Sequence, residues 1–204
     1  MKNKKIIVLS IISIILCLVL GLMVRKSEEG ILFDERIMEY VHNRTTPLGI
    51  NIMGKITHLG SVYFLAFIGT VILLYMQRRK KKKELILLLL STLGSYGLNF
   101  TLKNIFLRSR PIKYFLIEQG GYSFPSGHSM VSMTFYTAMT FLITRKIHNK
   151  KLRTILWILN SLTIFLIGFS RIYLGVHWPT DVVMGFIIGL IFIYASIKAL
   201  NLAK

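Results

Sequence analysis

Residues 170–181, SRIYLGVHWPTD, separate two long apolar runs of the chain. Within these twelve residues the sequence places a cation, Arg171, an imidazole, His177, and a carboxylate, Asp181. A charged group at membrane depth costs roughly 2.5–3.5 kcal/mol on insertion scales, so it needs a partner or a function. Pro179 interrupts any helix that precedes it, and Asp181 suits the first turn of the next one. The stretch therefore predicts two membrane helices that meet at a polar junction.

The composition is that of a membrane protein. Of the 204 residues, 53% are hydrophobic and the mean hydropathy is +0.60, which is too apolar for an ordinary soluble domain. A net charge of +18 would point to nucleic acid in a soluble protein. Here most Lys and Arg flank apolar runs, where they anchor helices, so we expect a lipid bilayer and no nucleic acid as partner. The single cysteine, Cys17, lies inside an apolar run and cannot form an internal disulfide.

Six apolar runs predict six spanning helices, since each span needs roughly 20 residues. The runs cover about 6–24, 61–76, 85–106, 126–143, 154–169 and 181–200. We therefore expect an all-α fold, a six-helix transmembrane bundle that forms one domain over residues 1–204.

The segment between the first two spans has a different pattern. From residue 31 to 41, apolar residues recur at helical spacing with charged residues, including Asp34 and Glu35, between them. This pattern predicts short interfacial helices over residues 31–60. They either shape a lipid entrance or only connect two spans, and the sequence leaves both interpretations open.

The basic residues indicate an orientation. If the amino terminus is cytoplasmic, sixteen of the 26 basic residues fall on the cytoplasmic side, in short segments at 2–5, 78–83, 145–153 and 198–204. An excess of Lys and Arg in short cytoplasmic loops is the usual rule for membrane proteins. We therefore expect both termini in the cytoplasm. Residues 170–181 then lie at the outer face, together with two other polar segments, 103–111 and 125–128.

Residues 125–128, Pro-Ser-Gly-His, open the fourth predicted span. Ser126 is a suitable N-cap, Gly127 lets the backbone approach a ligand closely, and the free N–H groups of a helix start attract anions. His128 would lie beside such an anion and could protonate a leaving oxygen. The simpler interpretation is a capped helix with a spectator histidine.

Residues 103–111 supply two further cations, Lys103 and Arg110, which are seven positions apart. Two helical turns would bring both onto one face. Guanidinium groups bind phosphate oxygens in pairs, and lysine binds them as a point charge. The simpler interpretation is that these side chains reach back to the membrane interface, which we expect more of Arg108 and Lys113.

Considered together, the three segments predict a phosphoryl-transfer site. They supply cations, two histidines, a carboxylate and a helix start on one face, which is what transfer through a histidine nucleophile needs. The cations would replace a metal ion in stabilising the phosphoryl oxygens, and no group of residues has metal-ligand spacing. We therefore expect neither a metal nor a cofactor.

The three segments also resemble a known signature, that of the type 2 phosphatidic acid phosphatase (PAP2) superfamily, which includes glucose-6-phosphatase and the vanadium haloperoxidases. Eleven fixed positions match in order. They are Lys103-x6-Arg110-Pro111, Pro125-Ser126-Gly127-His128 and Ser170-Arg171-x5-His177-x3-Asp181. The six-span layout is similar to that of the small bacterial integral-membrane members.

The resemblance implies a role for each matched residue and a reaction without a metal. It makes His177 the nucleophile that forms a phosphohistidine, Asp181 the group that holds it, and His128 the general acid. The implied phosphate-binding residues are Lys103, Arg110 and Arg171, with Ser126 and Gly127 assisting and Ser170 included by its place in the motif. The lipid members of the superfamily have their site at the outer face, as expected here.

The expected activity is that of a plasma-membrane lipid phosphatase. Phosphatidylglycerol phosphate is the favoured substrate, and undecaprenyl diphosphate and phosphatidate are alternatives. A lipid-binding or transport protein that has kept the fold is an alternative of another class, although binding alone would not need two histidines. Haloperoxidase chemistry fits poorly with a chain of membrane spans. The sequence carries no indication of oligomeric state.

Overall fold

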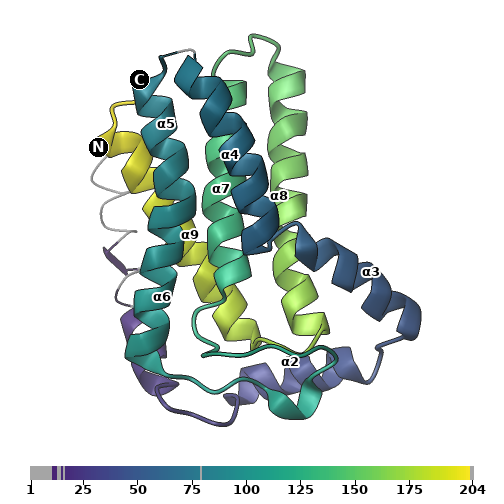
Figure 1. The fold of residues 1–204 in the computed structure, drawn as a ribbon. Coiled ribbons are helices and arrows are strands. Elements are labelled where there is room, and N and C mark those ends of the chain that lie inside the picture. Colours follow the sequence, from purple (N-terminus) through teal and green to yellow (C-terminus); the bar gives the residue numbers. More distant parts are fainter. Residues whose placement is uncertain (1–10, 13–14, 16, 79, 203–204) are drawn as a thin grey trace.

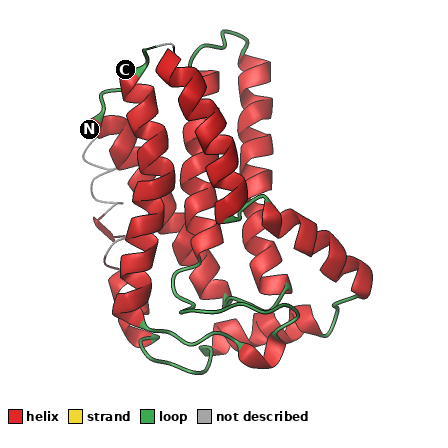
Figure 2. Cartoon of the chain, viewed as in Figure 1, coloured by secondary structure: helices red, strands yellow, loops and turns green. Residues whose placement is uncertain are grey.

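The computed structural model describes residues 11–202 except 13–14, 16 and 79. Within this part of the chain, all regular structure is helical, so the all-α prediction is confirmed (Figure 2). The helices are α2 (Leu32–His42), α3 (Pro47–His58), α4 (Val62–Arg78), α5 (Lys82–Leu89), α6 (Ser95–Phe106), α7 (Gly127–Thr144), α8 (Lys150–Tyr173) and α9 (Pro179–Ala199). A π-helical segment, Leu90–Gly94, joins α5 to α6, and a 3-10 turn, Ile112–Tyr114, lies between α6 and α7.

Among the residues that the structure describes, four stretches are long and apolar enough to cross a membrane. They are Pro47–Arg78, Lys82–Phe106, Lys150–Tyr173 and Pro179–Ala199. The predicted first span, 6–24, lies partly outside the described residues, and the described residues between 11 and 23 are helical. The chain is therefore an integral membrane protein, while the count of six spans stays a prediction.

The central helix of the bundle is α7, which packs against α6, α8, α9 and the π-helical segment (Figure 1). Helix α7 carries polar side chains that bond to neighbouring helices. Thr134 donates to Ser91 O of the π-helical segment at 2.6 Å, and Thr140 donates to Asn160 of α8 at 3.1 Å. Since both partners belong to other helices, α7 does not need a wholly apolar surface.

Close packing between α7 and α9 depends on two small residues of α9. A Cβ at Gly185 would lie 2.8 Å from Ser126 O, and one at Gly189 would lie 2.7 Å from Met130 O. Glycines four positions apart let two membrane helices approach at backbone distance. This contact fixes the start of α9 beside the start of α7.

The predicted interfacial segment, 31–60, forms α2 and α3. Helix α2 lies across one end of the bundle, and α3 leans away from it (Figure 1). The inward face of α2 consists of Asp34, Met38 and Val41. Met38 and Val41 pack with Trp178 in one apolar cluster. Asp34, one of the charged residues between the apolar positions, is completely buried.

The two ends of the bundle are formed by different loops and helices. The turn between α4 and α5, the loop between α7 and α8, and the end of α9 lie at one end (Figure 1). The loops 107–126 and 174–178 lie at the other end together with α2. All three polar segments singled out in the sequence reach this second end.

Candidate active site

The three polar segments surround one cavity of about 260 Å³. Its lining includes six of the nine residues singled out from the sequence: Lys103, Arg110, Gly127, His128, Arg171 and His177. These side chains come from α6, the loop 107–126, α7, α8 and the loop 174–178. The convergence of residues far apart in sequence is what a shared site requires. The remaining three, Ser126, Ser170 and Asp181, lie behind the wall of the cavity.

His177 presents one ring nitrogen to this cavity and the other to the protein interior. Its Nε2 lies 3.1 Å from Arg110 Nη1, and its Nδ1 lies 3.2 Å from Ser123 Oγ. A guanidinium only donates, so Nε2 accepts and the proton belongs on Nδ1. Burial, and next the charge of Arg110, hold the pKa of His177 well below its usual range. The imidazole is therefore neutral at physiological pH, with an unprotonated Nε2.

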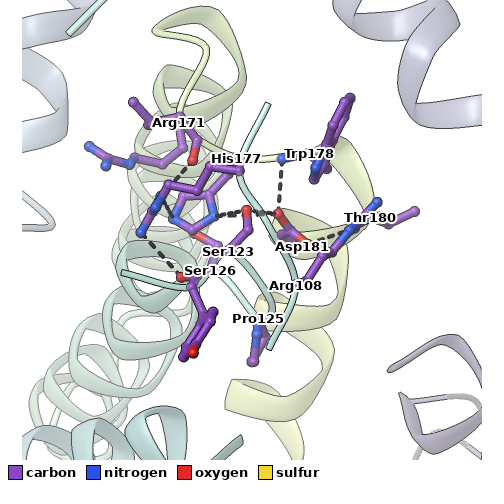
Figure 3. Close-up of polar contacts among 12 residues, drawn as sticks. Arg108, Ser123, Pro125, Ser126, Arg171, His177, Trp178, Thr180 and Asp181 are labelled. Carbon is purple, nitrogen blue, oxygen red and sulfur yellow. Dashed lines mark hydrogen bonds and ion pairs between the residues drawn. The ribbon is translucent and has the colours of Figure 1, made fainter. Parts of the chain in front are cut away.

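Ser123 stands between His177 and Asp181 (Figure 3). Its hydroxyl donates to Asp181 Oδ2 at 2.5 Å and accepts from His177 Nδ1. The direct distance from His177 Nδ1 to Asp181 Oδ2 is 3.5 Å, beyond a good hydrogen bond. We expected the carboxylate to hold the imidazole by itself. The structure instead adds a serine hydroxyl that the sequence did not reveal.

Asp181 is completely buried at the start of α9, and both of its oxygens are bonded. Oδ1 pairs with Arg108 Nη1 at 2.7 Å, and Oδ2 accepts the Trp178 N–H at 2.9 Å. Asp181 therefore also acts as a cap of α9, the simpler role that its position allowed. The two roles use the same carboxylate, so the helix start and the imidazole are aligned together.

Arg110 is held by the loops on either side of the cavity. Its Nε donates to Gly121 O at 2.8 Å, and its Nη1 donates to Val176 O at 2.5 Å. Burial lowers the pKa of Arg110 to about 10, so the guanidinium stays charged at neutral pH. Lys103 approaches from α6 and donates to the carbonyl oxygens of Tyr122 and Ser123. Two positive groups therefore line the same cavity as His177.

Arg171 completes the set of cations from the last turn of α8. Its Nη1 donates to Thr57 at 2.7 Å, and its Nη2 donates to Gln119 at 2.7 Å. Its Nε is buried and has no hydrogen-bond partner among the described residues. Thr57 belongs to α3, so the interfacial segment contributes to the site. This contribution favours more than a connecting role for residues 31–60.

The start of α7 forms the opposite wall. Ser126 is the N-cap and accepts from Ser129 N at 3.4 Å, as its sequence context predicted. Gly127 faces Asn99, whose Oδ1 would lie 3.0 Å from an added Cβ. His128 follows in the first turn and lines the cavity. The free N–H groups of this helix start are therefore near His128 and available to an anion.

Two residues of the polar segments lie elsewhere than we expected. Ser170 donates to Ile167 O within α8 at 2.6 Å and does not line the cavity. Arg108, which we expected to reach the membrane interface, is completely buried against Asp34 and Asp181. No signal in the sequence marks Arg108, because its burial arises only when α2 places Asp34 beside it.

The chain is similar to known proteins in sequence and in structure. The PAP2 superfamily model matches residues 84–203. Phosphatidylglycerophosphatase B of Bacillus subtilis is 34% identical over 166 residues, which cover 79% of this chain and 80% of that protein. An undecaprenyl-diphosphatase of Sulfolobus acidocaldarius is 40% identical over 68 residues, which cover 33% of this chain and 29% of that protein.

A solved structure extends the likeness to the whole fold. The crystal structure of a transmembrane PAP2-type phosphatidylglycerolphosphate phosphatase from Bacillus subtilis superimposes with a TM-score of 0.84 at 28% identity. The match covers 96% of this chain and 97% of that one. The family model and the relative of similar length cover most of the elements that build the cavity. This chain belongs to the PAP2 superfamily.

Proposed function

We propose that this chain is a membrane lipid phosphatase that transfers the phosphoryl group to His177 and then to water. One observation carries the proposal. The unprotonated Nε2 of His177 borders a cavity that Lys103, Arg110 and Arg171 also line. A nucleophile among fixed cations is suited to a phosphoryl group, because the cations offset its negative oxygens while the nitrogen approaches phosphorus.

The proposed reaction has two steps. Nε2 attacks phosphorus, the bond to the lipid oxygen breaks, and His128 donates a proton to that oxygen. Asp181, through Ser123 and directly, stabilises the positive charge that develops on the ring of His177. Water then attacks the phosphohistidine, His128 takes a proton from that water, and inorganic phosphate leaves. The three cations hold the phosphoryl oxygens throughout, so we expect activity in the presence of EDTA.

A groove next to the cavity supports a lipid substrate. Its volume is about 330 Å³, and it runs between α4 and the α5–α6 helix. Val62, Leu65, Tyr96 and Val131 line both the groove and the cavity. An acyl or prenyl chain in this groove would place its phosphate among the cations. A water-soluble phosphate ester would leave this apolar surface unused.

We infer phosphatidylglycerol phosphate as the first substrate candidate. The support is the relative of similar length, whose name gives that activity. Undecaprenyl diphosphate is the second candidate, because a relative named for it shares a shorter region. We also propose that the site opens at the outer face, since the basic segments 78–83 and 145–153 connect helices at the other end of the bundle.

The test uses purified protein in detergent, EDTA, and a panel of lipid and soluble phosphates. We expect release of phosphate from the lipids, and a loss of roughly 10³-fold or more in kcat for His177→Ala. His148→Ala, at an exposed histidine of the other end, is the matched control and should keep full activity. Full activity of His177→Ala would exclude the nucleophile. Wild-type protein inactive on every lipid would exclude the function.

A further inference from the structure

Arg108 lies buried between two carboxylates that come from different elements. Its Nη2 is 2.7 Å from Asp34 Oδ2 of α2, and its Nη1 is 2.7 Å from Asp181 Oδ1 of α9. All three side chains are 0% exposed. Removing three charges from water offsets most of what their attraction gains, so such a cluster is a weak source of stability. Its position behind His177 indicates a role of the cluster in the site rather than in stability.

Asp34 also binds the backbone on which Asp181 stands. Its Oδ1 accepts the Thr180 N–H at 2.9 Å, and its Oδ2 accepts the Thr180 hydroxyl at 2.9 Å. Arg108 Nη1 donates to the same hydroxyl oxygen at 2.8 Å. Thr180 is in the first turn of α9, where N–H groups lack partners within the helix. A residue of α2 therefore caps the helix that carries Asp181.

These contacts fix the rotation of the Asp181 carboxylate. Arg108 occupies Oδ1, so Oδ2 is left to accept from Trp178 N and from Ser123. Charge matters as well as geometry. Arg108 is shared with Asp34, so the group Asp34–Arg108–Asp181 keeps a net negative charge of one. That charge is available to a positive ring at His177, which lies 3.5 Å away.

We propose that Asp34 and Arg108 are positioning residues of the phosphoryl-transfer site and act through Asp181. The inference rests on the proposed function, and it assigns a part in the reaction to the interfacial helix α2. Neither residue borders the cavity, so neither would touch a phosphate held there. Their effect is confined to the orientation and charge of the group behind the nucleophile. The step most sensitive to both is transfer to His177.

The chain supplies a matched control one residue away. Glu35 lies on the same helix and pairs with Lys113 of the same loop at 2.8 Å. That pair is partly exposed, with 62% of Lys113 and 29% of Glu35 accessible, and it does not contact Asp181. Asp34→Asn and Glu35→Gln each remove one negative charge that attaches α2 to the loop 107–126. Only Asp34→Asn disturbs the network behind His177.

The experiment is a rapid-quench single turnover with radiolabelled lipid phosphate, using the full chain in detergent. The amplitude reports the fraction of intact sites, and the rate constant reports the chemical step. For Asp34→Asn we expect the rate constant to fall by roughly 10²-fold at an unchanged amplitude, as misplacement of a catalytic group does. Glu35→Gln should match the wild type in both. A reduced amplitude with a wild-type rate constant for Asp34→Asn would overturn the proposal.

Arg108→Lys serves as a second variant, because lysine keeps the charge but cannot bridge both carboxylates. Its rate constant should fall similarly, and a wild-type rate constant would overturn the proposal even if Asp34→Asn does not fold. The double variant should be no slower than the slower single variant, since both act by one route. Failure of the proposed function is distinct, because it would show as no turnover by the wild type.

Discussion

At the scale of single residues, Ser123 changes the expected relation between His177 and Asp181. An imidazole that donates to a carboxylate directly is the usual arrangement for a histidine nucleophile or base. Here the bonds run from His177 Nδ1 to Ser123 Oγ and from Ser123 Oγ to Asp181 Oδ2. A hydroxyl can donate to one partner and accept from the other, so it extends the reach of the carboxylate. Ser123 should therefore matter for rate and little for phosphate binding.

The variant Ser123→Ala tests this role. Hydrogen bonds to charged groups contribute about 1.5–3 kcal/mol, so we expect kcat to fall by about tenfold or more while KM stays within about twofold. Steady-state kinetics on the lipid that the wild type prefers give both values. Ser196→Ala removes a hydroxyl that bonds within α9 to Phe192 O and is the control. A wild-type kcat for Ser123→Ala would show that Asp181 acts on His177 unaided.

The site residues that could be predicted from the sequence belong to motifs, and those that could not be predicted do not. Cations and histidines at motif positions have recognisable spacing, and all five of them line the cavity. Arg108 and Asp34 carry no such spacing, and their meaning depends on burial. Burial arises only when α2 folds across the bundle and places Asp34 at the start of α9. A pattern of alternating apolar and charged residues cannot show which charge turns inward.

At the scale of elements, the site depends on a direct contact between two loops. Leu116 N of the loop 107–126 donates to Leu174 O of the loop 174–178 at 3.1 Å. Gly175 follows with φ of +74° and lies so close to Tyr114 that a Cβ would overlap its carbonyl. His177 is two residues further along. The position of His177 therefore depends on a backbone contact that only glycine allows.

Gly175→Ala is expected to lower both stability and activity. The left-handed backbone costs a non-glycine residue about 1–2 kcal/mol, and the overlap with Tyr114 adds to it. Gly121→Ala is a matched control, because its φ is +72° but no atom lies within 4 Å of an added Cβ. Thermal unfolding in detergent should show a clearly larger decrease in Tm for Gly175→Ala. Equal decreases would mean that the loop contact is dispensable.

Helix positions were predictable within a few residues where apolar runs are long. The predicted span 85–106 corresponds to α5 through α6, and 126–143 corresponds to α7. The span predicted at 154–169 is too short, because α8 continues to Tyr173 and carries Ser170 and Arg171 in its last turn. A span predicted from hydropathy ends before the first charged residue. The helix itself continues, because Arg171 forms hydrogen bonds with Thr57 and Gln119.

At the scale of the whole molecule, charge is separated along the bundle. The loop between α7 and α8 is basic, as is the turn between α4 and α5. The end with α2 carries Glu28, Glu29, Glu35 and Glu118, and three of its cations, Arg108, Arg110 and Arg171, are buried. When the cations with partners in the site are left out of the count, the remaining Lys and Arg are in excess at the α7–α8 end. This excess favours that end as the cytoplasmic one.

This orientation predicts a labelling pattern. The single native cysteine, Cys17, is replaced by alanine, and one cysteine is introduced at an exposed position of either end, Glu118→Cys or Lys146→Cys. In intact bacterial cells without an outer membrane, a thiol reagent that cannot cross the bilayer should label the variant at 118 and spare the one at 146. Permeabilised cells should show labelling of both, which controls for reactivity. The reverse pattern would place the site on the cytoplasmic side. The basic loops would then lie outside the cell, against the usual excess of Lys and Arg in cytoplasmic loops.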